Sequence, residues 1–96
     1  MDSVRLDKFL WAARFYKTRA LSQQMIEGGK VKIDGERVKP ARAIRPGTII
    51  SIRQGRQRRE IEVLALSEKR GSAPEAQKLY RDLEQPTEIG VFDDDM

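Results

Sequence analysis

Hydrophobic residues in the first thirty positions recur at helical spacing in two short segments. The first segment, residues 5–14, places four apolar side chains on one face of a helix: Leu6, Phe9, Leu10 and Ala13. Thr18 is a competent N-cap for a second helix over residues 19–27, and Gly28-Gly29 ends that helix because glycine adopts the left-handed conformation without a Cβ penalty. Helices of roughly nine residues are unstable alone in water, so the pair must pack on further structure.

The next segments change to the two-residue alternation of strands. Apolar residues alternate with lysines from position 30, and Asp34-Gly35 is a type I′ turn signal, so residues 30–39 predict a hairpin. A β-branched run over residues 48–53 and an alternation that begins at Ile61 predict two further strands. Residues 54–59 are polar and arginine-rich, and we expect an exposed loop there. The pattern therefore predicts an α+β fold in which two short helices pack on one face of a small, mostly antiparallel sheet.

The composition changes after Arg70. Ser72 and Glu75 have the spacing of a capping box, and apolar residues at helical spacing then predict a short C-terminal helix: Ala76, Leu79, Tyr80 and Leu83. The last residues are acidic and include three aspartates at positions 93–95, for which we expect a frayed tail. We therefore expect a binding domain of residues 1–70, followed by a short helix and acidic tail over residues 71–96.

The composition also narrows the classes of function. A chain of 96 residues suffices for one small domain. The sequence contains neither Cys nor His, which excludes a disulfide framework and a cysteine nucleophile and removes the usual general base near neutral pH. No apolar run approaches the roughly 18 residues of a membrane span. We therefore expect a cytoplasmic protein that is not an enzyme, uses no cofactor or metal, and has neither a membrane nor a small-molecule partner.

Charge is distributed unevenly along the chain. Residues 1–70 hold seventeen Lys or Arg and eight Asp or Glu, a net charge of +9, whereas residues 71–96 hold two and seven, a net charge of −5. The modest total of +4 hides this asymmetry, which is typical of a polyanion-binding surface beside an acidic segment. An ordinary solvated surface with helical ion pairs is the alternative that the pattern leaves open.

Basic residues of the helix pair and the first strand are the main candidates for binding phosphates. They lie outside the apolar stripe of the first helix and continue around both ends of the second: Arg5, Lys8, Arg14, Lys17, Arg19, Lys30 and Lys32. If these residues contact about six phosphates, the affinity for nucleic acid is expected to fall roughly a thousandfold when the salt concentration rises from 50 to 200 mM. Tyr16, in the turn beside Lys17, is the candidate for contact with a nucleic-acid base.

Two further features are candidates for the same surface. Residues 53–59 contain four arginines that could widen the contact, although a mobile solvated turn explains them equally well: Arg53, Arg56, Arg58 and Arg59. Trp11 and Phe15 stand four residues apart on the side of the first helix opposite its apolar stripe. They either pack against another element or offer a stacking surface to a base, and we favour packing.

Several runs resemble the S4 RNA-binding domain family, whose helix pair, loop and strands form the αL motif. The resemblance covers about residues 4–52 and rests on the order helix, helix, glycine and hairpin: Arg5-Leu6-Asp7-Lys8-Phe9-Leu10, Thr18-Arg19, Met25-Ile26 and Gly29-Lys30-Val31-Lys32-Ile33-Asp34-Gly35. The sequence departs from the family pattern at Thr18, Asp34 and Thr48, and these residues keep the chemistry of the cap and the turns. The resemblance implies RNA binding through the seven basic residues named above.

Residues 10–31 are similar to a ribosome-associated heat-shock branch of this family. That resemblance implies binding to ribosomal RNA on a free large ribosomal subunit that carries a nascent chain on tRNA, in ribosome rescue or recycling. The expected partners are thus ribosomal RNA, the large subunit and tRNA, and we expect a monomer. Two alternatives remain: a module that targets an RNA-modifying enzyme or tRNA synthetase in trans, and a helix-turn-helix DNA-binding protein, against which the hairpin after the second helix argues.

Overall fold

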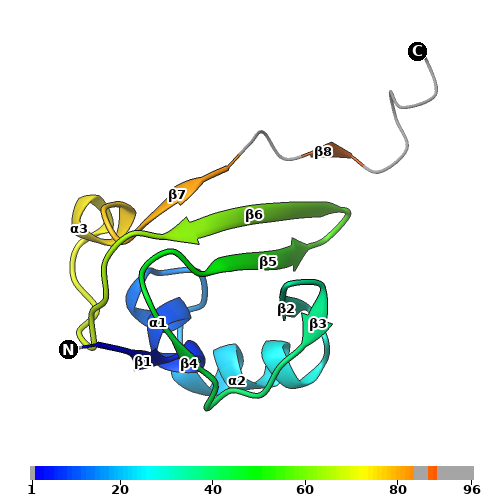
Figure 1. Cartoon of the computed structure of the whole chain (residues 1–96), viewed down its shortest axis with the longest axis horizontal. Coiled ribbons are helices and arrows are strands. Elements are labelled where there is room, and N and C mark those ends of the chain that lie inside the picture. Colours follow the sequence, from blue (N-terminus) through cyan, green and yellow to red (C-terminus); the bar gives the residue numbers. More distant parts are fainter. Residues whose placement is uncertain (1, 84–86, 89–96) are drawn as a thin grey trace.

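The computed structural model describes residues 2–83 and 87–88. Two helices come early, α1 (Leu6–Ala12) and α2 (Arg19–Glu27), and α3 (Ala73–Gln77) comes late (Figure 1). The strands follow in chain order: β1 (Val4–Arg5), β2 (Val31–Ile33), β3 (Glu36–Arg37), β4 (Ala43–Ile44), β5 (Ile49–Gln54), β6 (Gln57–Val63), β7 (Tyr80–Asp82) and β8 (Thr87–Glu88). These elements confirm the predicted α+β class.

Most strands belong to one antiparallel sheet with the order β3-β2-β5-β6-β7, and β8 also pairs with β6. The register places Val31 opposite Ile52 and Ile50 opposite Ile61, so apolar residues from three strands share one face. A separate two-stranded ladder joins β1 to β4 and ties the start of α1 to the segment before β5. The predicted mostly antiparallel sheet is confirmed.

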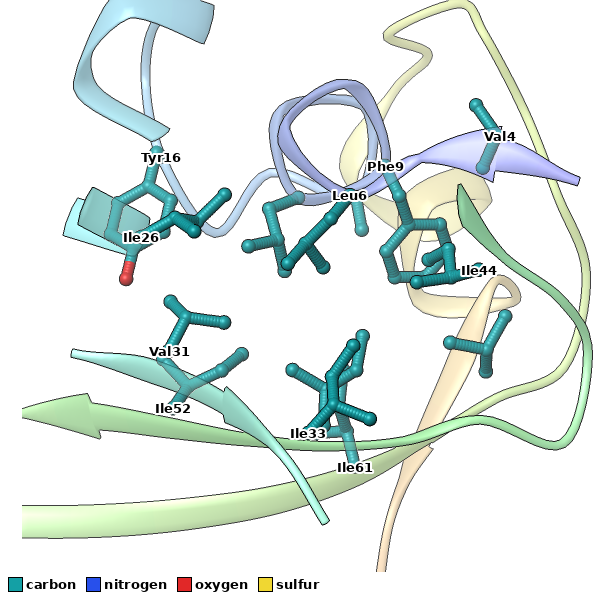
Figure 2. Close-up of a cluster of buried hydrophobic side chains, with 14 residues drawn as sticks. Val4, Leu6, Phe9, Tyr16, Ile26, Val31, Ile33, Ile44, Ile52 and Ile61 are labelled. Atoms are coloured by element: carbon teal, nitrogen blue, oxygen red, sulfur yellow. The ribbon is translucent and has the colours of Figure 1, made fainter. Parts of the chain in front are cut away.

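The helix pair covers the apolar face of this sheet. In Figure 2, Leu6 and Ile26 of the helices face Val31 and Ile33 of β2. The buried cluster takes its large side chains from both layers: Leu6, Phe9, Leu10, Ile26, Val31, Ile33, Ile50, Ile52, Ile61 and Val63. Full burial of each contributes roughly 2 kcal/mol, which is why helices too short to be stable alone persist in the fold.

The bounds of the helix pair agree with the sequence at α2 and differ at α1. The second helix occupies the predicted residues 19–27, whereas the first is shorter than the predicted residues 5–14. It begins only at Leu6 because β1 occupies the two preceding residues by pairing with β4. After Ala12 the chain leaves the helix, and Arg14 takes φ +67°, a conformation that cannot continue it.

Local signals at the ends of α2 and in the first hairpin are confirmed. Thr18 Oγ1 accepts a hydrogen bond from the Leu21 N–H at 3.0 Å and caps the helix. Gly29 ends it with φ +81°, in the left-handed region where glycine carries no Cβ penalty. Asp34 and Gly35 have φ of +55° and +76°, the two positive values that a type I′ turn requires.

The exposed loop predicted over residues 54–59 is wrong. Residues 57–59 belong to β6, and the ladder with β5 runs out to Gln54 opposite Gln57, so the turn contains only Gly55 and Arg56. Arginine-rich polarity indicates solvent exposure, but the side chains of a paired strand can also be exposed on one face of the sheet. Figure 1 shows the resulting long β5–β6 hairpin extending beyond the helix pair.

The third helix is only partly as predicted. Its capping box is confirmed, because Ser72 Oγ accepts from the Glu75 N–H and Glu75 Oε1 accepts from the Ser72 N–H. The predicted continuation through Tyr80 and Leu83 is wrong, since Tyr80 begins β7 on the edge of β6. Pairing with β7 satisfies the backbone groups along this edge of β6, which would otherwise be left open. The predicted acidic tail, with its aspartates at positions 93–95, lies outside the described residues.

Candidate nucleic-acid interface

The outer face of the sheet gathers four cations around one depression. Residues that alternate with the buried positions of β2, β5 and β6 point away from the helices. Together with Gly29, Ser51 and Gln57, four of them line a cavity of ≈ 200 Å³, and we call these four the basic face: Lys30, Lys32, Arg53 and Arg58. Two basic segments that are more than twenty residues apart in sequence therefore meet in space.

Backbone pairing fixes the spacing of the basic face. The Arg53 N–H donates to the Lys30 carbonyl at 2.8 Å, and Arg53 lies directly opposite Arg58 in the ladder. Like charges on directly opposed strand positions repel and destabilise a hairpin. Further along the same face the outward residues become acidic, with Glu60 opposite Ser51, so the basic face has a definite border.

The basic face has no salt-bridge partner among residues 2–83. The ion pairs in that range involve Arg5, Arg19, Arg59 and Arg81. Cations gathered around a depression attract a polyanion by Coulomb interaction and counterion release. The arrangement is thus suited to holding phosphate groups.

A second basic cluster lies on the helix pair and is organised by Asp7, which is fully buried. Arg5 donates two hydrogen bonds to its carboxylate at 3.0 and 3.1 Å, Gln23 donates one at 2.8 Å, and Arg19 lies 3.7 Å away. Burial acts against the charged form, but the hydrogen bonds from Arg5 and Gln23 outweigh it and hold the pKa of Asp7 below its usual value. The carboxylate is therefore ionised at neutral pH and orients two of the predicted RNA-binding arginines.

Other predicted helix residues are not drawn into either cluster. Arg14 is exposed and its Nε donates to the Gly71 carbonyl at 2.8 Å, so this side chain ties the segment before α3 to the end of α1. Lys17 is exposed in the turn between the helices, and Lys8 is half-buried. The structure thus divides the predicted residues between two clusters and isolated positions.

Aromatic residues of the α1–α2 turn pack inward. Phe15 contacts Tyr80 with ring centroids 4.7 Å apart, and the Arg59 guanidinium lies 5.3 Å from the Phe15 ring centroid. The packing favoured for Phe15 is confirmed. Tyr16 is only 8% exposed and belongs to the core cluster, so its ring is not presented to solvent as a stacking surface.

The four arginines of the second predicted contact separate into three environments. Arg53 and Arg58 belong to the basic face, and Arg56 is exposed at the hairpin turn. Arg59 lies on the inner side of the sheet and donates three hydrogen bonds to Asp82, so it is committed to packing. Because successive residues of β6 face opposite sides of the sheet, Arg58 points outward and Arg59 inward. The sequence gives this signal only if residues 57–59 are assigned to a strand rather than to a loop.

The described residues contain no group of three or more His, Cys, Asp or Glu that could hold a metal ion. Among the same residues, no helix has the length and apolar character needed to cross a membrane. Sequence reasoning missed three residues of the depression, Gly29, Ser51 and Gln57, because only the non-local pairing of β2, β5 and β6 brings them together.

The fold and the basic helix pair define the class of protein as an S4 domain: the family model with that description matches residues 4–50. The chain is 57% identical over 81 residues to the heat shock protein 15 homolog of Aeromonas salmonicida, covering 84% of this chain and 61% of that protein. A trimeric structure of Vibrio cholerae heat shock protein 15 superimposes with a TM-score of 0.80 at 52% identity, covering 84% of this chain and 82% of that chain.

A more distant relative is the RQC P-site tRNA stabilizing factor of Bacillus subtilis, 31% identical over 65 residues, which cover 68% of this chain and 76% of that protein. The chain spans 61% to 64% of the length of the heat shock protein 15 relatives. The chain belongs to the S4 domain family, in its heat shock protein 15 branch.

Proposed function

We propose that this protein is a non-enzymatic RNA-binding protein that associates with the ribosome through phosphate contacts. The observation that carries the proposal is the basic face, where Lys30, Lys32, Arg53 and Arg58 surround one depression without an acidic partner in residues 2–83. Arg5 and Arg19, which Asp7 orients on the helix pair, form a second contact in this proposal. Kinship with the heat shock protein 15 branch supports it.

Recognition in this proposal depends on shape and charge and only slightly on base sequence. Structured RNA is read mostly through its backbone geometry, and lysine and arginine contacts to phosphates position a protein without reading bases. If the basic face neutralises four phosphates, the affinity falls on the order of a hundredfold between 50 and 200 mM salt.

The more specific proposal is that the RNA lies on a free large ribosomal subunit that carries a nascent chain on tRNA, as in ribosome rescue or recycling. Two observations support it: the chain is 57% identical to a heat shock protein 15 homolog, and it is 31% identical to a protein whose name says that it stabilises a P-site tRNA. Contacts would then include ribosomal RNA and tRNA. The monomer expected from the sequence stays a prediction, and the Vibrio cholerae relative is described as trimeric.

Sedimentation with isolated large subunits tests this function. The protein is mixed with subunits that carry peptidyl-tRNA or lack it, at 50 and 200 mM salt, and the bound fraction is measured. We expect co-sedimentation that is stronger with peptidyl-tRNA and weaker at high salt. Equal binding to both kinds of subunit would contradict the tRNA contact, and no binding to either would contradict ribosome association.

A further inference from the structure

Beside the basic face lies a second cavity of ≈ 250 Å³. Its wall is formed by the α1–α2 turn, the end of α2, the start of β2 and the β5–β6 turn, through six residues: Tyr16, Met25, Lys30, Arg53, Gln54 and Gly55. Lys30 and Arg53 line both cavities, so the second one continues the basic face toward the helix pair.

The Tyr16 hydroxyl is the unusual group in this cavity wall. The residue is 8% exposed, and its hydroxyl is buried with no hydrogen-bond partner in the part of the chain that the structure describes. Figure 2 shows the hydroxyl directed toward the start of β2, the end at which Lys30 lines the cavity. Buried polar groups are nearly always paired, so this hydroxyl is available to a hydrogen-bonding ligand in the adjoining cavity.

The lining has a distinct chemical character. Met25 supplies an apolar, polarizable surface, Gln54 an amide, and Lys30 and Arg53 supply positive charge. Burial raises the pKa of Tyr16 above its usual value, so the hydroxyl keeps its proton at neutral pH and can both donate and accept. A ligand that satisfies all of these groups needs a flat apolar body, a hydrogen-bonding edge and a negative charge.

We propose that this cavity holds a single unstacked nucleotide of the bound RNA, with its base against Met25 and the Tyr16 hydroxyl and its phosphate at Lys30 and Arg53. The inference rests on the proposed function, because the nucleotide belongs to RNA that lies on the basic face. The cavity is smaller than the roughly 300 Å³ at which sites for drug-sized ligands begin, which suits one base. Bases that are splayed out of loops and bulges are the usual targets of sequence-specific RNA recognition.

The β5–β6 turn forms the exposed part of the cavity wall. Gln54 and Gly55 are exposed, and among residues 2–83 the Gln54 side chain makes no hydrogen bond that would hold it in place. In the proposed site, the base enters past this side chain, which is free to rotate without disturbing the core. The apolar ring of Tyr16 stays packed while its hydroxyl binds.

A titration of the full chain tests the proposal, with the backbone amide shifts of Met25 and Gly55 followed by NMR. The probes are the four nucleoside 5′-monophosphates, with ribose 5-phosphate as the probe that lacks a base. We expect at least one monophosphate to shift both amides and to bind at least about tenfold more tightly than ribose 5-phosphate. Tyr16→Phe removes only the hydroxyl and is expected to weaken that monophosphate about fivefold while leaving ribose 5-phosphate binding unchanged.

Two comparisons separate a ligand role from a structural one. Because the Tyr16 hydroxyl has no protein partner, Tyr16→Phe is expected to leave the melting temperature unchanged or to raise it. Tyr80→Phe, which removes a hydroxyl outside the cavity, is expected to leave monophosphate binding unchanged. A melting temperature lowered by Tyr16→Phe would mean that the hydroxyl has a structural partner, and would overturn the proposal.

The proposal is also overturned if no monophosphate shifts the two amides, if ribose 5-phosphate binds as tightly as the monophosphates, or if Tyr16→Phe binds them as tightly as the wild type. Sedimentation with large subunits keeps this failure distinct from failure of the proposed function. If the wild-type protein co-sediments with large subunits but the titration fails, only the nucleotide site is contradicted. If the protein does not co-sediment, the proposed function is contradicted as well.

Discussion

Asp7 shows how one residue serves both stability and binding. Its carboxylate is fully buried in the first turn of α1, where it accepts hydrogen bonds from Arg5 and Gln23 and neutralises Arg19. Its backbone carbonyl also accepts from Ser22 Oγ at 3.0 Å, which ties α1 to α2. The two hydrogen bonds to Asp7 restrain the Arg5 side chain, so less of its side-chain entropy is lost when it binds phosphate.

We expect Asp7→Asn to lower the free energy of unfolding at pH 7 by about 2 kcal/mol, as measured by urea denaturation. The amide keeps the shape of the side chain but removes the charge that Arg5 and Arg19 neutralise. These arginines are 49% and 40% exposed, so solvent screens part of the loss. Asp34→Asn, at the exposed hairpin turn, is the matched control and is expected to leave the stability unchanged.

The dependence of this difference on pH follows from the direction of the Asp7 pKa shift. The pKa is lower in the folded state than the value of about 3.9 expected for an unfolded chain. The carboxylate therefore stabilises the fold above about pH 4, and this contribution is lost as the pH falls through the folded-state pKa. Urea denaturation of wild type and Asp7→Asn is expected to show a difference that is full at pH 7 and smaller at pH 3; a constant difference would contradict the assignment.

An aspartate in the first turn of a helix is ordinarily a partner of the helix dipole, and the sequence indicates no more than that. The contacts of the Asp7 carboxylate with Arg19 and Gln23 depend on how closely α2 approaches α1, which is set by the crossing of the two helices. Tyr16 is similar: its place beside Lys17 in sequence predicts a surface residue, but the turn directs its ring into the core.

At the scale of the element, α2 is the segment whose structure the sequence predicts best. Thr18 caps its start, and Gly29 ends it in a left-handed conformation that brings the Arg37 side chain close. Arg37 Nη2 then donates to the Glu27 carbonyl at 2.6 Å and satisfies one of the free acceptors at the end of the helix. Capping signals are local, so they can be recognised without knowing the fold.

Removing the N-cap is expected to destabilise the protein. Thr18→Ala loses the oxygen that accepts from the Leu21 N–H, and we expect the free energy of unfolding to fall by about 1 kcal/mol. Thr18→Ser keeps the accepting oxygen and is the control, expected to be nearly as stable as the wild type. Chemical denaturation of the three proteins under one condition makes the comparison, and an alanine variant as stable as the serine variant would refute the cap.

Gly29 and Gly35 allow a comparison of backbone strain with side-chain contact. Both have similar positive φ values, +81° and +76°, but a Cβ at Gly29 would lie 3.3 Å from Arg37 Nε, whereas one at Gly35 would meet nothing within 4 Å. We expect Gly35→Ala to cost about 1 kcal/mol from strain alone, and Gly29→Ala to cost up to about 1 kcal/mol more, because the Arg37 side chain that donates to Glu27 must shift to admit the Cβ. Equal losses in thermal denaturation would show that Arg37 contributes nothing to the end of α2.

At the scale of the whole molecule, the sheet places the basic face. Apolar alternation predicts which side of each strand is buried, but joining Lys30 to Arg53 and Arg58 requires the order β2-β5-β6 and its register. Those are non-local pairings that no window of sequence contains. Hydrophobic patterning predicted the α+β class, the helix pair, the first hairpin, most of β5 and the end of β6. The start of β6 and all of β7 were mispredicted, because polarity and helical spacing are ambiguous in short segments.

The most direct test of phosphate binding by the basic face is the salt dependence of RNA affinity in a fourfold variant: Lys30→Gln, Lys32→Gln, Arg53→Gln and Arg58→Gln. The control replaces four exposed cations elsewhere and so removes the same charge: Lys39→Gln, Arg45→Gln, Lys69→Gln and Lys78→Gln. Binding to large subunits is measured from 50 to 200 mM salt. We predict that the slope of log affinity against log salt becomes shallower by about 3 in the first variant and changes little in the control. A basic-face variant that keeps the wild-type affinity and slope would contradict this account.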